Sequence, residues 1–493
     1  MRIPRTVLVA LSLAVVAVAF LPCLKGGFFN WDDGEYVVSN PVIRSLAPAN
    51  LGAAFSSFFV GHYQPLTILS YSLDHRLSGL NPFGYHLTNF LLHLSNCLLV
   101  IWLFRRVTGN VLIACVTGLV FGLHPLRAES VAWISARKEL LYASFFLCAL
   151  IAYDSYLKKG GARGYLLAFL FFLCALLSKV TAAILPLVLF LFDYLAGKKF
   201  DRRSLVEKVP FFLASIILGL VNVFGQASAG AVRQEGAGLL EKAGVAAAAV
   251  FFYLGKTFIP VNLSCAYPRF STNGAVMAVS AVSLAVFICL VMITGRFTKK
   301  MVFGFCFFLI CLLPVLQFVP LGSVMAADRY TYVPAIGLAY LLAEGFGLLW
   351  QKSSPARKYL SFFSVCVLIV LAGLTWDRCF AWRDSVSLWS REIRDRPGNP
   401  TAYFGRGSAY LGLRMYKESY LDLKTCLYLA PEYKEVYLKL AKLYRALNKK
   451  DDMIWALRRY CAAFPGDADA RAWLEAIDKP GNRDVQYKQE DML

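Results

Sequence analysis

The stretch Phe29-Asn30-Trp31-Asp32-Asp33-Gly34-Glu35-Tyr36 stands between the first two long apolar runs of the chain. Three carboxylates fall within four positions, although only 17% of all residues are charged. Neighbouring carboxylates repel and raise one another's pKa, which is a common way to make a proton acceptor or a cation site. A solvated loop with a helix cap is the alternative that the composition of this stretch leaves open.

The residues around this stretch have the pattern of an outer loop lying on a membrane. Asn40-Pro41 and Asn50-Leu51 are typical helix starts, and an apolar helical face follows Asn50. His62-Tyr63-Gln64-Pro65-Leu66 begins a further amphipathic helix. Such helices lie along a membrane surface, so residues 25–85 are expected to hold the acids at its edge.

The overall composition is that of a polytopic membrane protein. Of the 493 residues, 58% are hydrophobic, and the mean hydropathy is +0.56. The net charge is +20, but the basic residues gather at the ends of apolar runs, as in Arg105-Arg106, Lys158-Lys159 and Lys299-Lys300. This placement is typical of cytoplasmic loops, so the charge indicates orientation rather than nucleic-acid binding. The 13 cysteines are scattered without a CxxC pair, which predicts neither a disulfide framework nor a metal site.

Residues 1–375 are predicted to form about eleven transmembrane helices, with the N-terminus in the cytoplasm. No cleavage site follows the first apolar run, so we expect an uncleaved helix. Residues 245–259 are also apolar, but Lys256, Pro260 and Pro268 interrupt this part of the chain. We therefore expect a re-entrant or surface-lying segment there. An odd number of spans places the acidic loop and the C-terminal region on the same outer side.

The C-terminal region has a repeated helical pattern. From Trp376 the sequence becomes polar, and Pro397, Pro431 and Pro465 are each 34 residues apart. A 34-residue period with a closing proline resembles the tetratricopeptide repeat, a pair of antiparallel helices. The prediction is a connecting helix over 376–396, a repeat domain over 397–480 with two repeats and a capping helix, and a polar tail over 481–493.

Three further polar clusters stand where spans are expected to end on the outer side. They are the segment from His124 to Glu139, the lone lysine of Ser178-Lys179-Val180-Thr181, and Asp328-Arg329-Tyr330-Thr331. The alternatives are that Glu139 interacts with the helix dipole and pairs with Arg137, and that Lys179 only snorkels. Together, however, the clusters predict an outer cavity with carboxylates on one side and Lys179 and Arg329 on the other. Such a cavity suits a reaction that deprotonates a hydroxyl and releases a phosphate.

These motifs resemble the GT-C glycosyltransferases, which take sugars from polyprenyl- or dolichyl-phosphate carriers. Within that class the chain is most similar to the transmembrane and tetratricopeptide-repeat O-mannosyltransferases and their bacterial relatives. The resemblance covers the whole chain, and it implies an all-α polytopic protein with a GT-C-type domain over 1–375, followed by the repeats. The matching segments are Trp31-Asp32-Asp33, Asn40-Pro41, Gln64-Pro65-Leu66-Thr67, Asn81-Pro82-Phe83-Gly84-Tyr85-His86-Leu87, His124-Pro125-Leu126, Glu129-Ser130-Val131-Ala132-Trp133, Arg137-Lys138-Glu139, Leu177-Ser178-Lys179, Ala327-Asp328-Arg329-Tyr330 and Trp382-Arg383-Asp384-Ser385.

The resemblance also implies roles for individual residues. Asp32 would be the general base on the acceptor hydroxyl, Asp33 would orient that hydroxyl or bind the sugar, and Glu139 would complete the acidic side. The carrier phosphate would be held by Lys179, Arg329 and Tyr330. The rest of the substrate pocket would be formed by Trp31, His62, Gln64, His124, Glu129, Arg137, Lys138 and Asp328. No cofactor is required, although the Asp32–Asp33 pair is a candidate site for a divalent cation.

The expected function is inverting transfer of a mannose-like or other hexose from a polyprenyl-phosphate carrier to a hydroxyl of a protein or glycan. It would take place on the periplasmic side of the cytoplasmic membrane, among membrane lipids, with the acceptor protein bound through the repeats and without nucleic acid. Two alternatives stay open. An oligosaccharide ligase or polymerase is also polytopic, but its large outer loop comes late in the chain. A non-catalytic scaffold would leave Asp32, Lys179 and Arg329 without a role.

Overall fold

The structure, a computed structural model, describes residues 4–230, 238–267, 273–294, 298–316, 326–351 and 354–478. The predicted polar tail 481–493, the last residues of the repeat domain and the end of the expected span 301–321 lie outside the described residues. The chain divides into two compact units, Met1–Arg383 and Asp384–Leu493. Every named element in the described part is a helix, as the composition predicts.

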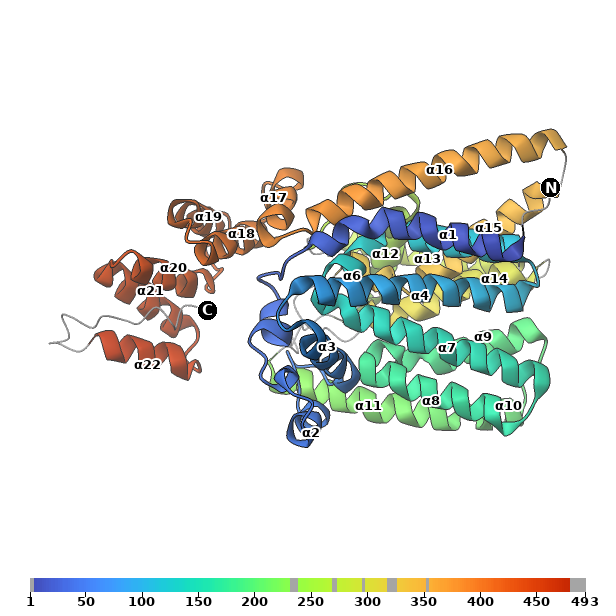
Figure 1. Cartoon of the computed structure of the whole chain (residues 1–493), viewed down its shortest axis with the longest axis horizontal. Helices are drawn as coiled ribbons and strands as arrows, with labels where there is room; N and C mark the ends of the chain where they lie inside the picture. Colours follow the sequence, from blue (N-terminus) through green and yellow to red (C-terminus); the bar gives the residue numbers. More distant parts are fainter. Residues whose placement is uncertain are drawn as a thin grey trace. The chain divides into compact units, whose positions relative to one another are not determined.

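The first unit has a helix at each of the eleven places where an apolar run predicted a span. In Figure 1 most of these helices lie roughly along the horizontal, parallel or antiparallel to one another. They are α1 (Arg5–Phe20), α4 (Pro82–Thr108), α5 (Val111–Leu123), α7 (Arg137–Lys159), α8 (Ala162–Ser178), α9 (Leu185–Ala196), α11 (Val209–Ser228), α13 (Gly274–Thr294), α14 (Lys299–Leu312), α15 (Ala335–Trp350) and α16 (Ser354–Ala381).

Not all of these helices are long enough to span a membrane alone. Among the described residues, six helical segments are long and apolar enough, or seven if the bent pair Val111–Leu123 and Pro125–Ala132 is one span. The segments Ala162–Ser178, Val180–Ala196 and Ala335–Trp350 are apolar but shorter. The chain is therefore a membrane protein with several spans, and the number eleven stays a prediction.

The hairpin of α4 and α5 shows how local sequence sets the helix ends. Gly109 has φ +69°, a left-handed conformation that ends α4 at little cost. Asn110 then caps α5, because its side chain accepts a hydrogen bond from the backbone N–H of Leu112 at 2.9 Å. The two helices approach closely at Gly118, where a Cβ atom would lie 2.4 Å from Ile101. A larger residue there would force the hairpin apart.

A cluster of buried charges connects the basic loop of residues 198–208 to α7 and α9. The Asp193 carboxylate accepts hydrogen bonds from Tyr153 Oη at 2.7 Å and Ser204 Oγ at 2.9 Å, and it forms an ion pair with the buried Lys208. Lys198 pairs with Glu207 at 2.5 Å. A buried charge is tolerated when it is paired and hydrogen-bonded in this way, so the cluster is structural.

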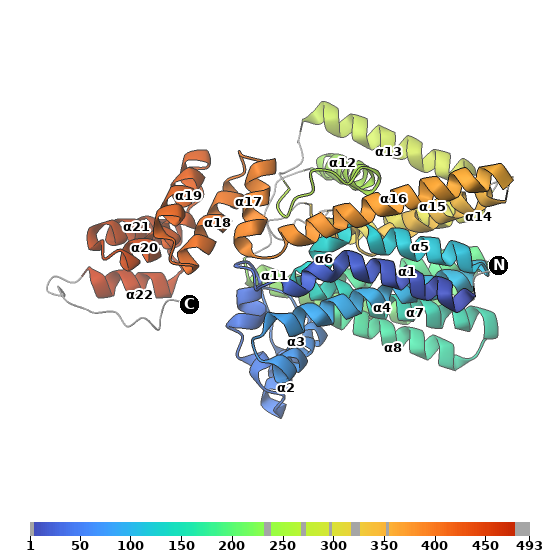
Figure 2. The same ribbon diagram turned by 45° about the horizontal axis from the view of Figure 1, so that its top comes forward.

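Residues Leu239–Phe258 form α12, a continuous helix of 20 residues, where the sequence predicted an interrupted segment. Lys256 lies in the last turn, and its Nζ donates to the carbonyl oxygen of Val261 at 2.7 Å. The lysine therefore stabilises the end of the helix rather than breaking it, and Pro260 lies beyond that end. In Figure 2, α12 is seen almost end-on while α13 and α14 run across the picture. The segment is thus one continuous helix inclined to its neighbours, and its re-entrant or surface-lying position in the membrane stays a prediction.

The acidic loop is a packed part of the first unit. It contains a π-helical turn (Gly34–Val38), a 3₁₀ turn η3 (Val42–Arg44), and the helices α2 (Pro48–Ser56) and α3 (Pro65–Ser78). The helix expected at Asn50 begins two residues earlier, at Pro48, whereas α3 begins at Pro65 within the predicted start. Tyr36, Ile68 and Tyr71 form a buried core. The acids therefore stand on a fixed support.

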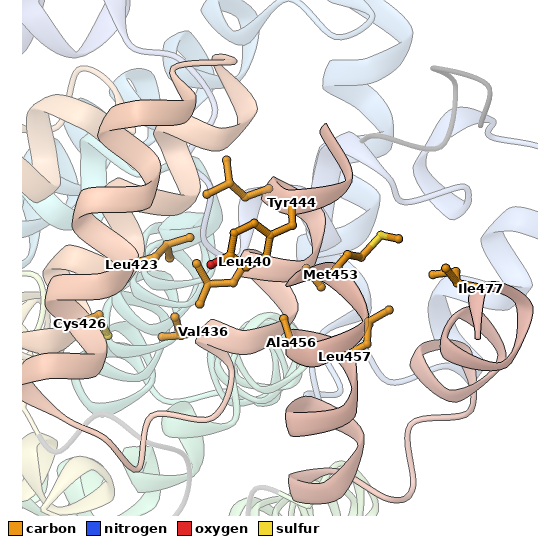
Figure 3. Packing of buried hydrophobic residues seen from close by; sticks show 11 residues of the cluster. Leu423, Cys426, Val436, Leu440, Tyr444, Met453, Ala456, Leu457 and Ile477 are labelled. Atoms are coloured by element: carbon orange, nitrogen blue, oxygen red, sulfur yellow. The ribbon is translucent and has the colours of Figure 1, made fainter. Parts of the chain in front are cut away.

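The second unit consists of α17 (Ser385–Asp395), α18 (Pro400–Gly412), α19 (Tyr416–Leu429), α20 (Val436–Ala446), α21 (Lys450–Ala463) and α22 (Ala468–Ile477). The pairs α18–α19 and α20–α21 are joined at equivalent turns, where Arg414 and Asn448 have left-handed φ values of 60° and 56°. Figure 3 shows the apolar core, in which Leu423, Leu440 and Leu457 are fully buried. The 34-residue periodicity thus corresponds to a repeated helical hairpin.

Candidate functional site

A cavity of about 420 Å³ in the first unit is lined by residues of the acidic loop and of all three predicted polar clusters. Its volume is that of an ordinary small-molecule site. The predicted site residues on its surface are Trp31, Asp32, His62, Gln64, Lys138, Glu139, Lys179, Arg329 and Tyr330. The other predicted residues, Asp33, His124, Glu129, Arg137 and Asp328, are buried and do not line it.

Asp32 presents its carboxylate to the cavity. Its backbone oxygen accepts hydrogen bonds from Glu35 N at 3.1 Å and Tyr36 N at 3.0 Å, which fixes the start of the π-helical turn. Its side chain remains 24% exposed, and the nearest cation is Lys138 Nζ, 3.9 Å from Oδ2. This carboxylate is therefore accessible to a molecule in the cavity.

Asp33 is directed into the protein. Its Oδ2 accepts a hydrogen bond from Phe29 N at 2.9 Å, and its Oδ1 accepts from Ser135 N at 2.9 Å and from the Ser135 hydroxyl. Complete burial raises the pKa of Asp33 to about 6, although the hydrogen bonds from Ser135 and Phe29 oppose the shift. The carboxylate therefore ties the acidic loop to the turn at Ile134–Ala136.

The different directions of Asp32 and Asp33 bear on the candidate cation site. Both oxygens of Asp33 are occupied by N–H or O–H donors, so the pair does not offer a shared set of free ligand atoms. In the part of the chain that the structure describes, no group of three or more His, Cys, Asp or Glu side chains has the arrangement of a metal site.

The first prediction separates these two carboxylates by stability. At neutral pH, Asp33→Asn is expected to lower the free energy of unfolding by about 1–3 kcal/mol, because an amide NH₂ group cannot accept a hydrogen bond from a buried N–H. Asp32→Asn should change it by less than about 0.5 kcal/mol. Chemical unfolding of the purified proteins measures both values, and equal losses would contradict the assignment.

The same two variants should differ in how their stability depends on pH. The pKa of Asp33 is about 6 in the folded chain, against 3.8 for an unperturbed aspartate. Stability from the protonated side chain is therefore present below about pH 3.8 and is lost as the pH rises through about 6. This part of the pH profile should be missing from Asp33→Asn and should remain in Asp32→Asn.

The cations on the cavity each have a carboxylate partner. Lys179 is paired with Glu139, and Arg329 with Glu129, whose Oε2 also accepts a hydrogen bond from Arg329 N at 2.9 Å. Glu129 raises the pKa of the Arg329 guanidinium against the opposing effect of burial. The Oε2 atom of Glu139 is buried and lacks a hydrogen-bond partner in the described chain. The cavity thus combines fixed positive groups with an unsatisfied carboxylate oxygen.

Aromatic rings surround these cations. Arg329 Cζ lies 5.2 Å from the ring centre of Trp133 and 4.9 Å from that of Tyr330. Trp133 also stacks on Trp31, with ring centres 4.9 Å apart, and on Trp382, with ring centres 6.0 Å apart. Trp31 and Trp133 therefore form an aromatic wall of the cavity, and Trp382 packs against this wall outside the lining.

Arg137 is buried outside the cavity lining and connects the helices beside it. It forms an ion pair with Asp74 at 2.5 Å and donates to Asn89 Oδ1 and the Tyr85 carbonyl oxygen, both at 2.8 Å. Its partner is thus Asp74 of α3, and the suggested pair with Glu139 is not formed. Because these contacts connect α3, α4 and the start of α7, Arg137 positions the segment that carries Lys138 and Glu139.

His124 and Asp328 also lie outside the cavity surface. A ring nitrogen of His124 lies 2.8 Å from the Thr257 carbonyl oxygen, which joins the end of α5 to α12. Asp328 accepts a hydrogen bond from Tyr267 Oη at 2.6 Å and lies 3.6 Å from Arg378 Nη2. Burial raises the pKa of Asp328 to about 7, which Arg378 opposes. These contacts support the turn that carries Arg329.

One face of α11 lines the cavity and was missed from the sequence. Gly219, Asn222, Val223 and Gln226 occur at helical positions i, i+3, i+4 and i+7 and share this face. Small and polar residues at this spacing within an apolar helix are a signal that could have revealed it. Asn222 and Gln226 also contact the loop before α3.

Asn222 and Gln226 fix the loop that carries His62 and Tyr63. Tyr63 N donates to Asn222 Oδ1 at 3.2 Å, and Gln226 Nε2 lies 2.9 Å from a ring nitrogen of His62. Burial lowers the pKa of His62 to about 3, with a smaller effect of nearby Lys138. His62 is therefore neutral and accepts the amide hydrogen at physiological pH.

No family model matches the chain. Protein O-mannosyl-transferase F38B6.6 of Caenorhabditis elegans is 25% identical over 459 residues, which cover 87% of this chain and 64% of that protein. Along most of its length the chain is similar to protein O-mannosyl-transferases. The resemblance to O-mannosyltransferases that was drawn from the motifs is thereby confirmed.

Two further protein O-mannosyl-transferases have the same relationship to the chain. Drosophila melanogaster Tmtc3 is 25% identical, with 82% of this chain and 52% of that protein covered. Human TMTC3 is 23% identical, with 90% and 53% covered. The chain thus spans between half and two thirds of the length of these relatives.

Proposed function

We propose that the chain is a GT-C-type glycosyltransferase that moves a hexose from a polyprenyl-phosphate carrier to a hydroxyl group of a protein. The observation that carries the proposal is the meeting of Asp32, Lys179 and Arg329 in one cavity. These residues come from three distant segments, and together they offer a proton acceptor and two cations. The similarity to protein O-mannosyl-transferases supports the same chemistry and makes mannose the first sugar to test.

The proposed reaction is a single displacement. Asp32 takes the proton from the acceptor hydroxyl as its oxygen forms a bond to the anomeric carbon of the sugar. The bond from that carbon to the phosphate oxygen breaks, and the electron pair leaves with the lipid phosphate. Attack opposite the departing phosphate inverts the anomeric centre. A serine or threonine hydroxyl is a weak nucleophile, so both the base and a stabilised leaving group are needed.

The cations are suited to the leaving phosphate because they are already held in place. Glu139 and Glu129 position Lys179 and Arg329 before any ligand binds, so little rearrangement is needed when negative charge develops. Arg329 offers several N–H donors and Lys179 a compact charge. Lys138 adds a third positive group beside Asp32.

The remaining parts of the proposal concern sidedness and the acceptor. The cavity would face the periplasm, because the basic loops indicate that the opposite helix ends are cytoplasmic. The hairpins α18–α19 and α20–α21 would be tetratricopeptide repeats that bind the acceptor protein.

The proposal is tested by glycoproteomics of the periplasmic fraction with and without the gene, followed by transfer in vitro. Loss of a hexose from a defined serine or threonine would name the acceptor. The purified chain should then transfer labelled mannose from mannosyl undecaprenyl phosphate to a peptide with that residue. Unchanged glycoproteins together with no transfer would refute the function.

A second prediction concerns the phosphate. Lys179→Ala is expected to weaken donor binding by about 1.5–3 kcal/mol, the value of a hydrogen bond to a charged group. Because this variant leaves Glu139 buried without its cation, the double variant Glu139→Gln/Lys179→Ala should be measured beside it. Lys300→Ala is the control, because it removes a half-exposed lysine that does not line the cavity. Wild-type affinity of both cavity variants would show that Lys179 does not bind the carrier.

A further inference from the structure

The lining of the cavity includes both charged and apolar residues. Its charged groups come from the acidic loop, α7, Lys179 and the turn at Asp328–Thr331. A different part of the lining is apolar and comes from α11 and the turn η7 (Leu313–Val315), with Gly219, Val223, Pro314 and Val315. Val223 is 41% exposed although it lines the cavity, and Pro314 is also exposed. These four residues, here named the α11–η7 mouth, therefore mark an opening.

The mouth lies beside the membrane. The segment Arg202–Ser228, which contains α11, is long and apolar enough to cross a bilayer. Its outer face carries the exposed side chains Ile216, Leu220 and Phe224, which need a hydrocarbon environment. An opening next to this face leads sideways into lipid rather than into water.

The donor of the proposed function has a shape that matches this arrangement. A sugar phosphate is of a size suited to a 420 Å³ cavity, whereas a polyprenyl chain is far too long to be enclosed with it. The negative phosphate would lie against Lys179 and Arg329, and the chain would have to leave through an apolar opening. We propose that the prenyl chain of the donor leaves the cavity through the α11–η7 mouth and passes over Gly219.

A second apolar groove provides a competing path. It has a volume of about 450 Å³ between α1 and α16 and is lined by residues such as Val15, Val18, Gly373 and Trp376. None of the described residues that line this groove is charged, so these residues offer no position for the phosphate next to the chain. The α11–η7 mouth is the opening that is continuous with the cations.

Gly219 allows a direct test, because a Cβ atom at this residue would meet no heavy atom within 4 Å. Gly219→Leu should therefore fill the mouth without displacing neighbouring atoms of the protein. Two other glycines in apolar helices have equally open surroundings and serve as matched variants. Gly345→Leu lies on an exposed part of α15, outside both openings, and Gly373→Leu fills the competing groove.

The first measurement is binding of undecaprenyl phosphate to the full chain in detergent. Gly219→Leu is expected to weaken binding at least ~10-fold, the factor that corresponds to losing contact with about two methylene groups. Gly345→Leu and Gly373→Leu should bind as the wild type does. Loss of binding in Gly373→Leu instead would place the chain in the other groove and overturn the inference. An equal loss for phosphatidic acid would also overturn it, because an ordinary phospholipid would then occupy the mouth.

The second measurement separates this inference from the proposed function on which it rests. Mannosyl citronellyl phosphate has a short chain, and mannosyl undecaprenyl phosphate a long one. Gly219→Leu should lower the ratio of kcat/KM for the long donor over the short donor at least ~10-fold. An equal decrease for both donors would overturn the path while leaving the function intact. If the wild type transfers from neither donor but binds undecaprenyl phosphate with the same dependence on Gly219, the function fails and the path stands.

Discussion

Asp32→Asn is expected to lower the rate of sugar transfer at least ~100-fold, the usual contribution of a positioned general base. The amide keeps the size of the side chain but cannot accept the proton of the hydroxyl. Donor affinity should barely change, because the proposed phosphate contacts belong to Lys179 and Arg329. Single-turnover transfer from mannosyl undecaprenyl phosphate to the acceptor peptide measures the chemical step directly.

Asp33→Asn provides the neighbouring control for this experiment. Asp33 has no access to the cavity, so its loss should act through stability and should be partly relieved at low temperature. Turnover of Asp32→Asn near that of the wild type would remove Asp32 from the role of base. Glu139, whose Oε2 is an unsatisfied acceptor at the cavity, would then be the group to test.

Arg329→Met is expected to destabilise the fold by about 3–5 kcal/mol, because it leaves the fully buried Glu129 carboxylate without a cation. The double variant Glu129→Gln/Arg329→Met should recover most of this loss, since a neutral amide is far less costly to bury. Thermal unfolding in detergent, monitored as the yield of monodisperse protein, gives the stability of each variant in this double-mutant cycle.

An exposed ion pair gives the control. Arg458 pairs with Asp478 at 2.8 Å, and the two side chains are 62% and 39% exposed. Arg458→Met should therefore cost no more than about 1 kcal/mol. If the double variant at Glu129 and Arg329 is as unstable as the single variant, the buried pair is not the cause of the loss, and Arg329 acts through its contacts with Trp133 and Tyr330.

Patterns that are local in sequence predicted most of the fold. Apolar runs predicted a helix at eleven places because each run is a property of neighbouring residues, and the 34-residue spacing predicted the hairpins of the second unit in the same way. One local detail of α12 was misread. Lys256 was read as an interruption, but a lysine in the last turn of a helix can reach the carbonyl groups beyond it.

The site was only partly predictable, since partner choice depends on packing between distant segments. Arg137 was expected in the cavity, yet Asp74 and Asn89 hold it behind the wall, and nothing near Arg137 in the sequence indicates those partners. Adjacent Asp32 and Asp33 were both expected at the substrate, but only Asp32 faces the cavity, because the backbone turn directs Asp33 into the protein. The contribution of α11 was missed, because Gly219 and Gln226 were read only as parts of an apolar span.

The three stacked indoles of Trp31, Trp133 and Trp382 have a spectroscopic consequence. Rings this close, at 4.9 Å and 6.0 Å and nearly parallel, share their electronic excitation, which produces a near-ultraviolet circular dichroism signal. Two of the rings line the cavity, so a ligand bound against them is expected to change this signal and the tryptophan fluorescence. The protein therefore contains its own optical probe of occupancy, which can be read in a stopped-flow instrument during a single turnover.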